Sequence, residues 1–371
     1  LCMGCCMYNL EDNFPIEIRG CTAFAYSRNG RLVYGRNNDL PPYLRDGCKS
    51  EIYAPRNGNR FYITTSSFIN GEEGLNEHGL AVAMTFVMTD LKKIKAGFNS
   101  CFIVRYLLEK ANDTKQAVSL LMNLPIASNC NILLADKRGN MVVAECTPTL
   151  KKVREAESFH GNRIVCTVNS FISDEMKPYD DANGNDYDSR KRYKVVIDSF
   201  SSGKIRDDYI ETTEQLLKGD YGFMCQYDNE PDFETVWSSM FDLESLCIYR
   251  AEGDPRKKKF MMDNRLHDLK MRGQEVVKKP ILPLPQKRQD LFYCSSLSAF
   301  STAFLMTVLE FVAPEIASTS IFCSSIIFPM TVSAAFPRSC LCSKMLILTI
   351  FPSSTVTSTL AYIKFTSYSP I

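Results

Sequence analysis

Short apolar runs, each bounded by Gly, Pro, Asn or Asp, fill the first two-thirds of the chain and predict β-strands. The clearest case is residues 21–39, where two such runs meet at Asn29-Gly30. Asn-Gly suits a type I′ turn because both central residues need positive φ, so we predict a tight hairpin. Further strands are expected at residues 60–68, 81–87, 128–136, 141–146 and 163–168, with two more in 233–250 around a Leu-Glu-Ser turn.

Helical periodicity appears in only a few places. Residues 102–110 and 115–124 read as amphipathic helices, the second capped by Asp113 or Thr114 and stopped by Pro125. Two more helices are expected at 189–197 and 213–217. Hairpins dominate and no βαβ alternation persists, which indicates an α+β fold.

The composition changes from about Gly273 onward. There is no Gly after Gly273, no Asn after Asn264 and no acidic residue after Glu315, although a folded segment of this length needs turns. Pro interrupts the apolar runs before any reaches the ~20 residues of a membrane helix. We predict that residues 273–371 are not a folded domain and arise from a misread frame or a read-through. A membrane-associating tail is the alternative.

Composition and charge exclude several classes of function. A formal net charge of +1 in 371 residues gives no electrostatic case for binding nucleic acid or an anionic membrane. The 15 Cys are scattered without zinc-site spacing and no glycine-rich phosphate loop occurs, so we expect neither a metal nor a cofactor. The chain opens without a basic-then-apolar signal segment, which predicts a cytoplasmic protein with reduced thiols. Because residue 1 is Leu, Met3 and Met7 are candidate starts.

Candidate chemistry lies at the open end of the first hairpin. A tight hairpin returns the end of its second strand to the start of its first, so Cys21, Arg36 and Asp39 should be neighbours. A cation beside a thiol favours the reactive thiolate, and the Asp can orient an amine or hold the Arg. The plain alternative is a half-buried strand Cys with an ion pair at the sheet end.

Gly-Cys-Thr at 20–22, followed by Gly-Arg-Asn-x-Asp at 35–39, resembles the acyl-coenzyme A:6-aminopenicillanic acid acyltransferase family. Its relatives are the choloylglycine and penicillin V hydrolases, all N-terminal-nucleophile (Ntn) hydrolases. The resemblance covers roughly residues 18–262 and implies a four-layer αββα sandwich with two mainly antiparallel sheets. It also implies cleavage between Gly20 and Cys21. Residues 1–20 would then be a removed leader and 21–272 the catalytic domain. Glycine tolerates strained backbone, which suits a scissile position, although an ordinary lead-in to a strand fits Gly20 equally well.

Two later segments also match the family and imply oxyanion donors. Thr-x-Asn-x-Phe at 167–171 implies that Asn169 stabilises the tetrahedral oxyanion, a task that suits a neutral amide. The unit Gly-Leu-Asn-Glu-His-Gly-Leu-Ala-Val at 74–82 implies a second donor near the end of the following strand, commonly an Asn. The nearest residue here is Thr85, which departs from the family pattern.

A third match, Ser-Arg-x-Arg-Tyr at 189–193, implies a late active-site arginine. Arg192 is the first choice and Arg190 the second, because the spacing alone does not separate them. The plain alternative is a solvated basic helix face.

Together the resemblance and the hairpin predict a cysteine hydrolase or acyltransferase for a small linear amide. The freed α-amine of Cys21 acts as base, the sulfur forms a thioester, and water, an amine or a thiol accepts the acyl group. Bile-salt, penicillin, peptide and acyl-homoserine-type amides all suit this chemistry. Two alternatives stay open. One is a Cys–His hydrolase on another fold, using His78, His160 or His267. The other is a non-catalytic binding protein that keeps the Ntn fold.

Overall fold

The structure, a computed structural model, describes residues 20–66, 70–181, 188–205, 208–228, 233–276, 326–328, 348–351 and 362–364. The chain divides into two units, Leu1–Pro280 and Ile281–Ile371. The described part of the second unit is a small antiparallel sheet in the order β15 (Ile326–Phe328), β16 (Leu348–Phe351), β17 (Tyr362–Lys364). The expected leader before Gly20 and most of the tail after residue 276 lie outside the described residues, so both domain predictions stay predictions.

The predicted hairpin forms the centre of the first unit. β1 (Gly20–Arg28) and β2 (Arg31–Leu40) pair antiparallel from Gly20↔Asp39 to Arg28↔Arg31. Asn29 and Gly30 join them with φ of 50° and 79°, as a type I′ turn requires. The hairpin prediction is confirmed.

Around this hairpin lies a sheet of seven strands in the order β10-β11-β1-β2-β12-β13-β14, with every neighbouring pair antiparallel. Its other strands are β10 (Glu157–Phe159), β11 (Asn162–Thr167), β12 (Glu234–Asp242), β13 (Cys247–Glu252) and β14 (Met261–Asp263).

A second antiparallel sheet of seven strands follows chain order, β3 to β9. Its strands are β3 (Lys49–Tyr53), β4 (Phe61–Thr65), β5 (Glu73–Asn76), β6 (Leu80–Phe86), β7 (Cys130–Asp136), β8 (Met141–Cys146) and β9 (Lys151–Glu155).

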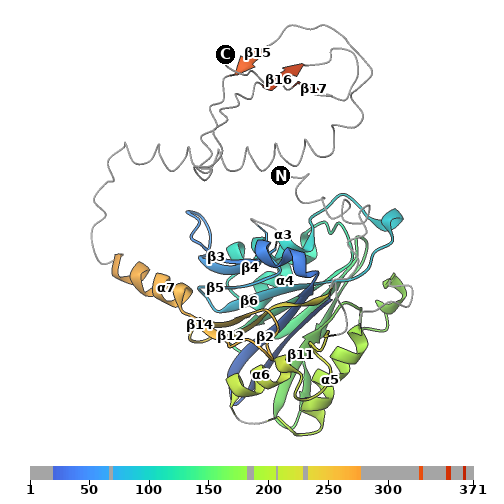
Figure 1. The fold of residues 1–371 in the computed structure, drawn as a ribbon, viewed down its shortest axis with the longest axis vertical. Helices are drawn as coiled ribbons and strands as arrows, with labels where there is room; N and C mark the ends of the chain where they lie inside the picture. Colours follow the sequence, from blue (N-terminus) through green and yellow to red (C-terminus); the bar gives the residue numbers. More distant parts are fainter. Residues whose placement is uncertain are drawn as a thin grey trace. The chain divides into compact units, whose positions relative to one another are not determined.

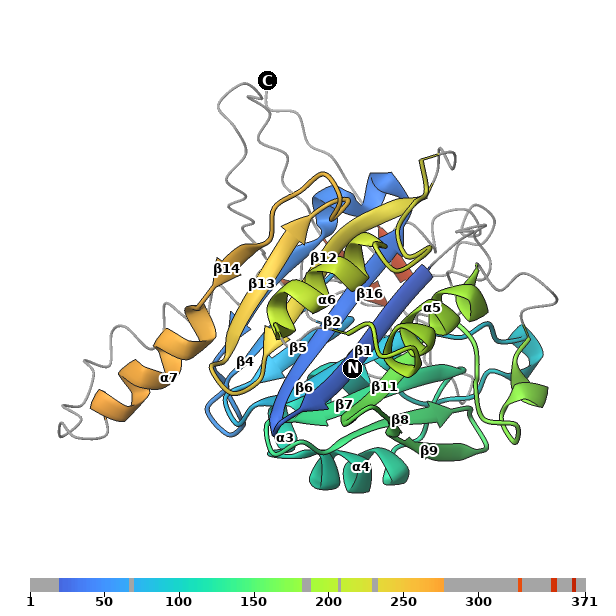
Figure 2. The same cartoon turned by 90° about the horizontal axis from the view of Figure 1, so that it is seen from below.

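Helices cover the outer face of each sheet (Figures 1 and 2). α3 (Ser100–Lys110) and α4 (Thr114–Asn123) pack on the β3–β9 sheet, and α5 (Ser189–Ser201) and α6 (Tyr209–Lys218) pack on the sheet that contains β1. The two sheets face each other through β1, β11, β6, β7 and β8. The predicted four-layer αββα fold is confirmed. The remaining helices are α7 (Arg265–Val276) and the 3-10 turns η1 (Pro42–Gly47), η2 (Leu91–Lys93) and η3 (Lys177–Tyr179). No helix in the part of the chain that the structure describes is both long and apolar enough to span a membrane.

Small side chains let the two sheets approach closely beside the start of β1. Alanines supply much of the buried layer between the sheets, namely Ala23, Ala25, Ala81, Ala83 and Ala135. Larger residues such as Tyr34 and Phe241 fill the same layer farther along the strands.

Capping Asp side chains decide where two of the predicted helices begin. Asp113, and not Thr114, caps α4, because its carboxylate accepts a hydrogen bond from the N–H of Gln116 at 2.9 Å. α6 begins at Tyr209, well before the predicted residue 213, because Asp208 caps it. Strand β5 ends with Leu75 and Asn76.

Asn76 joins the end of β5 to the end of helix α3. Its Nδ2 donates to the carbonyls of Leu108 at 3.0 Å and Ala111 at 2.7 Å, while its Oδ1 accepts from the N–H groups of His78 and Leu80. The side chain is fully buried, so every polar atom of its amide is satisfied inside the protein.

We expect Asn76→Ala to lower the free energy of unfolding by about 1–3 kcal/mol, because the N–H groups of His78 and Leu80 lose their acceptor while the two carbonyls keep the amide of Asn59 as a donor. Urea unfolding measures this loss. The matched control is Asn123→Ala, whose amide caps an exposed carbonyl on α4 at the opposite end of the helix pair and should cost under about 0.5 kcal/mol. A loss below about 1 kcal/mol for Asn76→Ala would contradict the role given to it.

β12 carries one extra residue opposite β2. Thr235 pairs with Asp39 and Trp237 pairs with Asn38, so Val236 is a β-bulge. Asp39 and Asn38 are adjacent and point to opposite faces of the sheet. The bulge therefore turns Thr235 toward the helix face and Trp237 toward the second sheet.

Candidate active site

Cys21 lies at the start of β1 with its side chain between the two sheets. Its Sγ is 3.1 Å from Nη2 of Arg36 and 3.1 Å from Oδ1 of Asn38. The hairpin register dictates this group, because Cys21 pairs with Asn38 and Arg36 lies two residues away on the same face of β2. The predicted contact between Cys21 and Arg36 is present.

Arg36 is fully buried and held by backbone from the other sheet. Its Nη1 donates to the carbonyls of Glu72 at 3.2 Å and Met84 at 2.5 Å, and its Nη2 donates to Asn38 Oδ1 at 2.5 Å. These bonds fix the guanidinium against the thiol. Asn38 was missed in the sequence, although the predicted hairpin places it directly opposite Cys21.

Burial raises the pKa of the Cys21 thiol, and this outweighs the opposite effect of the Arg36 charge. Arg36 lowers the pKa of the thiol, as expected of a cationic neighbour, but burial has the larger effect. The thiol needs a base to become a nucleophile.

Asp39 lies on the other face of the hairpin, opposite Gly20. It accepts hydrogen bonds from the Tyr227 hydroxyl at 3.1 Å and the Thr235 hydroxyl at 2.7 Å. Burial raises its pKa from 3.8 to about 6. Asp39 is thus placed beside the predicted cleavage position, whereas Arg36 is placed beside the sulfur. Both hydroxyl donors were missed in the sequence.

Close packing around Gly20 favours glycine at this position. A β-carbon built on it would lie 2.8 Å from the Phe233 ring and 3.1 Å from the Asp39 carboxylate. Its backbone lies in a regular strand pairing and is not among the positive-φ glycines. Close approach, and not a strained backbone, is what requires glycine here.

Asn169 and Arg192 hold the main chain of Cys21. Asn169 Oδ1 accepts from the Cys21 N–H at 2.6 Å and from Arg192 Nη2 at 3.0 Å. Arg192 Nη1 donates to the Cys21 carbonyl and to the Thr22 hydroxyl, both at 2.6 Å. Arg192 is fully buried, whereas Arg190 is exposed on the same helix. The structure therefore brings Arg192 to the site and leaves Arg190 outside it.

Thr85 is buried near the site but directed away from Cys21. Its hydroxyl donates to the Val168 carbonyl at 2.6 Å and lies 3.0 Å from the Thr167 hydroxyl. The amide of Asn131 donates to the Thr85 oxygen at 3.2 Å and to the Val168 carbonyl at 2.9 Å. Thr85 thus belongs to a polar cluster at the end of β11, and its hydroxyl proton is already donated to the Val168 carbonyl.

Histidine takes no part in the described contacts of Cys21. His160 Nε2 binds the Ser201 carbonyl, His267 pairs with Asp268, and His78 lies in the turn after β5. A Cys–His hydrolase needs one of these rings beside the thiol. The described contacts give that alternative no support.

The raised pKa of Asp39 predicts a pH-dependent cost to folding. Between about pH 4 and 6 the unfolded chain has lost this proton while the folded chain keeps it, so stability falls as the pH rises through this window. We expect Asp39→Asn to gain on the order of 1–2 kcal/mol relative to wild type between pH 4.5 and 7.5 in urea unfolding. Asp46→Asn, at an exposed position on η1, should show no such change with pH. A constant Asp39→Asn difference would contradict the buried-carboxylate assignment.

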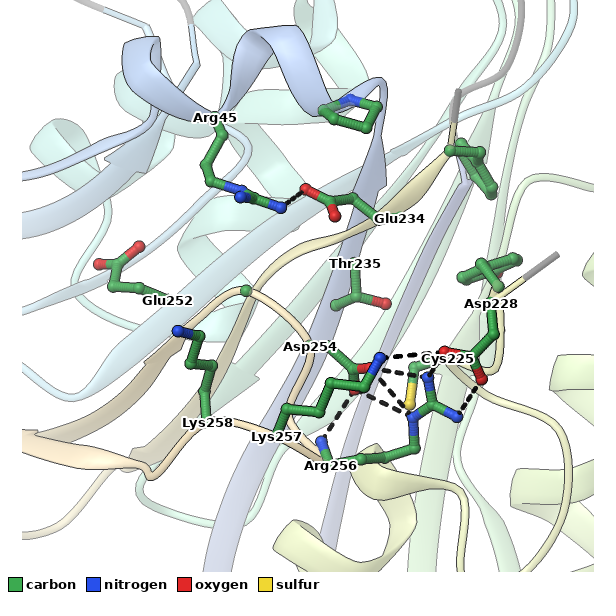
Figure 3. Close-up of a pocket in the computed structure, with 14 residues that line it drawn as sticks. Arg45, Cys225, Asp228, Glu234, Thr235, Glu252, Asp254, Arg256, Lys257 and Lys258 are labelled. Atoms are coloured by element: carbon green, nitrogen blue, oxygen red, sulfur yellow. Dashed lines mark hydrogen bonds and ion pairs between the residues drawn. The ribbon is translucent and has the colours of Figure 1, made fainter. Parts of the chain in front are cut away.

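A cavity of about 410 Å³ lies among η1, the segment after α6, the start of β12 and the turn after β13 (Figure 3). Its wall includes Tyr227 and Thr235, which bind Asp39, and Phe233, which contacts Gly20. The residues that contact Asp39 and Gly20 therefore also line a space for a small molecule.

A family model described as acyl-coenzyme A:6-aminopenicillanic acid acyl-transferase matches residues 26–257. The match begins after Cys21 and includes Arg36, Asp39, Asn169 and Arg192. No curated protein sequence matches the chain significantly.

Three solved structures show how far the structural similarity extends. A variant of conjugated bile acid hydrolase from Clostridium perfringens is 16% identical with a TM-score of 0.48, covering 67% of this chain and 94% of that chain. An N-acylethanolamine-hydrolyzing acid amidase orthologue from Caenorhabditis elegans is 16% identical with a TM-score of 0.46, covering 60% and 93%. Penicillin V acylase from Agrobacterium tumefaciens is 16% identical with a TM-score of 0.41, covering 62% and 83%.

Proposed function

The chain belongs to the acyl-coenzyme A:6-aminopenicillanic acid acyl-transferase family of Ntn hydrolases, and from this premise we propose that it cleaves a small linear amide, or transfers its acyl group, through Cys21. One observation carries the proposal. The thiol and both main-chain polar atoms of Cys21 are each held by a charged or amide side chain. A cysteine that only fills a core needs none of these contacts.

The first step is self-cleavage between Gly20 and Cys21. The Cys21 sulfur attacks the Gly20 carbonyl, the C–N bond breaks, and the acyl group moves to sulfur as a thioester while the nitrogen gains a proton. Water then hydrolyses this thioester and releases residues 1–20. Two features support the step: the Cys21 N–H already contacts Asn169, and Asp39 lies beside Gly20. The catalytic domain that begins at Cys21 extends to about residue 272.

The freed α-amine is the base for substrate turnover. Its unperturbed pKa of about 7.7–8.0 suits proton transfer near neutral pH, and Asp39 orients it. The amine takes the thiol proton, sulfur attacks the substrate carbonyl, and the leaving amine departs with that proton. Arg36 stabilises the sulfur as it becomes anionic. Water, an amine or a thiol then takes the acyl group from Cys21.

Asn169 is the proposed oxyanion donor in this cycle. Its Nδ2 donates to the Phe86 carbonyl at 3.0 Å in the uncut chain, so it must turn toward the substrate oxygen after cleavage. Arg192 holds Asn169 and the Cys21 carbonyl in place. Thr85 contributes no free hydroxyl, which is the observation that favours a second candidate function, a binding protein that kept the fold.

Intact mass and N-terminal sequencing of the purified full chain test the proposal. We expect the mature protein to begin at Cys21 and to react selectively with iodoacetamide at that residue. Release of amine from a panel of acyl anilides then tests turnover. A chain that keeps residues before Cys21 and hydrolyses no amide would favour the binding protein.

A further inference from the structure

The side chain of Asn38 places an amide donor beside the Cys21 sulfur. Asn38 lies directly opposite Cys21 on β2 and is fully buried. Its Nδ2 is buried too, and no atom of the described residues accepts a hydrogen bond from it. Unsatisfied polar atoms are rare in protein interiors because each one costs stability, so this donor needs a functional explanation.

Arg36 fixes which way this amide points. Its Nε and Nη2 donate to Asn38 Oδ1 at 3.1 and 2.5 Å, and the Cys21 thiol donates to the same oxygen at 3.1 Å. A guanidinium only donates, so the amide atom that faces it is the oxygen, and the NH₂ group is the other atom. Bonds from a cation also polarise the amide, which makes its N–H groups stronger donors. The donor is therefore held in one orientation before any substrate binds.

The strand pairing brings the Asn38 and Cys21 side chains close together. The N–H and the carbonyl of Cys21 are directed to Asn169 and Arg192, on the side of β11, and not to β2. Cys21 and Asn38 are therefore a non-hydrogen-bonded pair, in which side chains approach most closely. Two amides thus flank Cys21, Asn38 on β2 and Asn169 just after β11.

The Asn38 donor lies close to where negative charge develops during the reaction. When the Cys21 sulfur attacks a carbonyl, the carbon becomes bonded to sulfur and the oxygen on that carbon takes the negative charge. Asn38 Oδ1 is 3.1 Å from Sγ, and Nδ2 belongs to the same amide, so the donor is within reach of this oxygen. Thr85, by contrast, already donates its hydroxyl proton to the Val168 carbonyl.

We propose that Asn38 is a catalytic residue whose Nδ2 donates a hydrogen bond to the oxyanion that forms when Cys21 attacks a carbonyl, together with Asn169. No covalent bond of Asn38 forms or breaks. The proposal rests on the proposed function, because it assumes attack by the Cys21 sulfur. An asparagine that only holds Arg36 would use Oδ1 alone.

Variants that remove the donor test this proposal in the cleaved full-length protein. Asn38→Asp keeps an acceptor for Arg36 and Asn38→Leu keeps none, but both lose the N–H. Per molecule that begins at Cys21, we expect kcat/KM for pentanoyl p-nitroanilide to fall by about 10²–10³ in both variants, through kcat. Alkylation of Cys21 by iodoacetamide needs the thiolate but forms no oxyanion, so its rate should change less than about tenfold.

The matched control is Asn37→Ala, on the other face of β2. The amide of Asn37 is satisfied, since its Nδ2 donates to the Leu217 carbonyl at 2.9 Å and its Oδ1 accepts from the Ser238 hydroxyl at 2.6 Å. This variant should melt at a lower temperature, but its ratio of kcat/KM to alkylation rate should stay within about twofold of wild type. If Asn38→Leu does not fold, Asn38→Asp decides alone.

Two results would overturn the proposal while leaving the proposed function standing. One is wild-type kcat/KM in a folded Asn38 variant. The other is an equal fall in turnover and alkylation, which would leave Asn38 only the role of holding Arg36. If wild type cleaves itself but hydrolyses no anilide, the rate of self-cleavage decides, and it should fall about 10²-fold in the Asn38 variants but not in Asn37→Ala. Equal rates would reject the inference, and a wild type that does neither reaction would reject both proposals.

Discussion

Cys21→Ala is expected to keep every residue before position 21 and to lose amide turnover by a factor on the order of 10⁴ or more. Without the sulfur no thioester forms, so neither the Gly20–Cys21 bond nor a substrate amide is attacked. Intact mass reports the first effect and p-nitroaniline release reports the second. The protein should still fold, because the alanine fits the space and leaves only the Arg36 and Asn38 contacts with the thiol unmade.

Cys166→Ala is the matched control. Cys166 is fully buried in β11 of the same sheet, where it pairs with Phe24. This variant should be cleaved before Cys21 and should turn over amides, although with lower stability. Normal cleavage in Cys21→Ala would show that another group cuts the chain and would remove the basis of the mechanism.

Asn169→Ala is expected to slow amide turnover by about 10²–10³, the usual loss when one oxyanion donor is removed. Self-cleavage should slow as well, because the Cys21 N–H and Arg192 both lose their bond to Asn169 Oδ1. Single-turnover kinetics and a time course of intact mass separate the two effects.

Asn169→Asp divides the roles of this side chain. A carboxylate can still accept from the Cys21 N–H and from Arg192, but it donates nothing to an oxyanion. We expect cleavage to persist while turnover falls nearly as far as in Asn169→Ala. Asn162→Ala, at the other end of β11, should leave turnover unchanged. Wild-type turnover in Asn169→Asp would show that the amide N–H is not the donor.

Local chemistry made part of this site predictable. The Asn29-Gly30 turn fixes the hairpin register, and the register alone brings position 36 and position 38 to Cys21. The choice between Arg190 and Arg192 was not predictable, because it depends on the phase of α5. Residues two positions apart on an α-helix point in directions about 200° apart, so when one is buried the other is exposed. Only packing against β1 and β11 selects Arg192.

Other parts of the site depend on contacts between distant segments. Tyr227 lies in an irregular segment with no period, so nothing local assigns it to Asp39. Burial of the thiol, which outweighs the lowering effect of Arg36 on its pKa, depends on packing between the two sheets and not on the hairpin alone. Half-exposed, charged strands such as β3 and β9 carry too weak an alternation to be predicted.

The extra residue in β12 makes the length of that strand as important as its composition. Regular pairing with Val236 still in the strand would put Val236 opposite Asp39, and every residue before it would then change sides of the sheet. Thr235 would leave Asp39, and Phe233 would leave Gly20. An alignment that runs through β12 without allowing for this residue will therefore equate positions that face different layers. A relative without the bulge must supply the Asp39 donor from another position in its sequence.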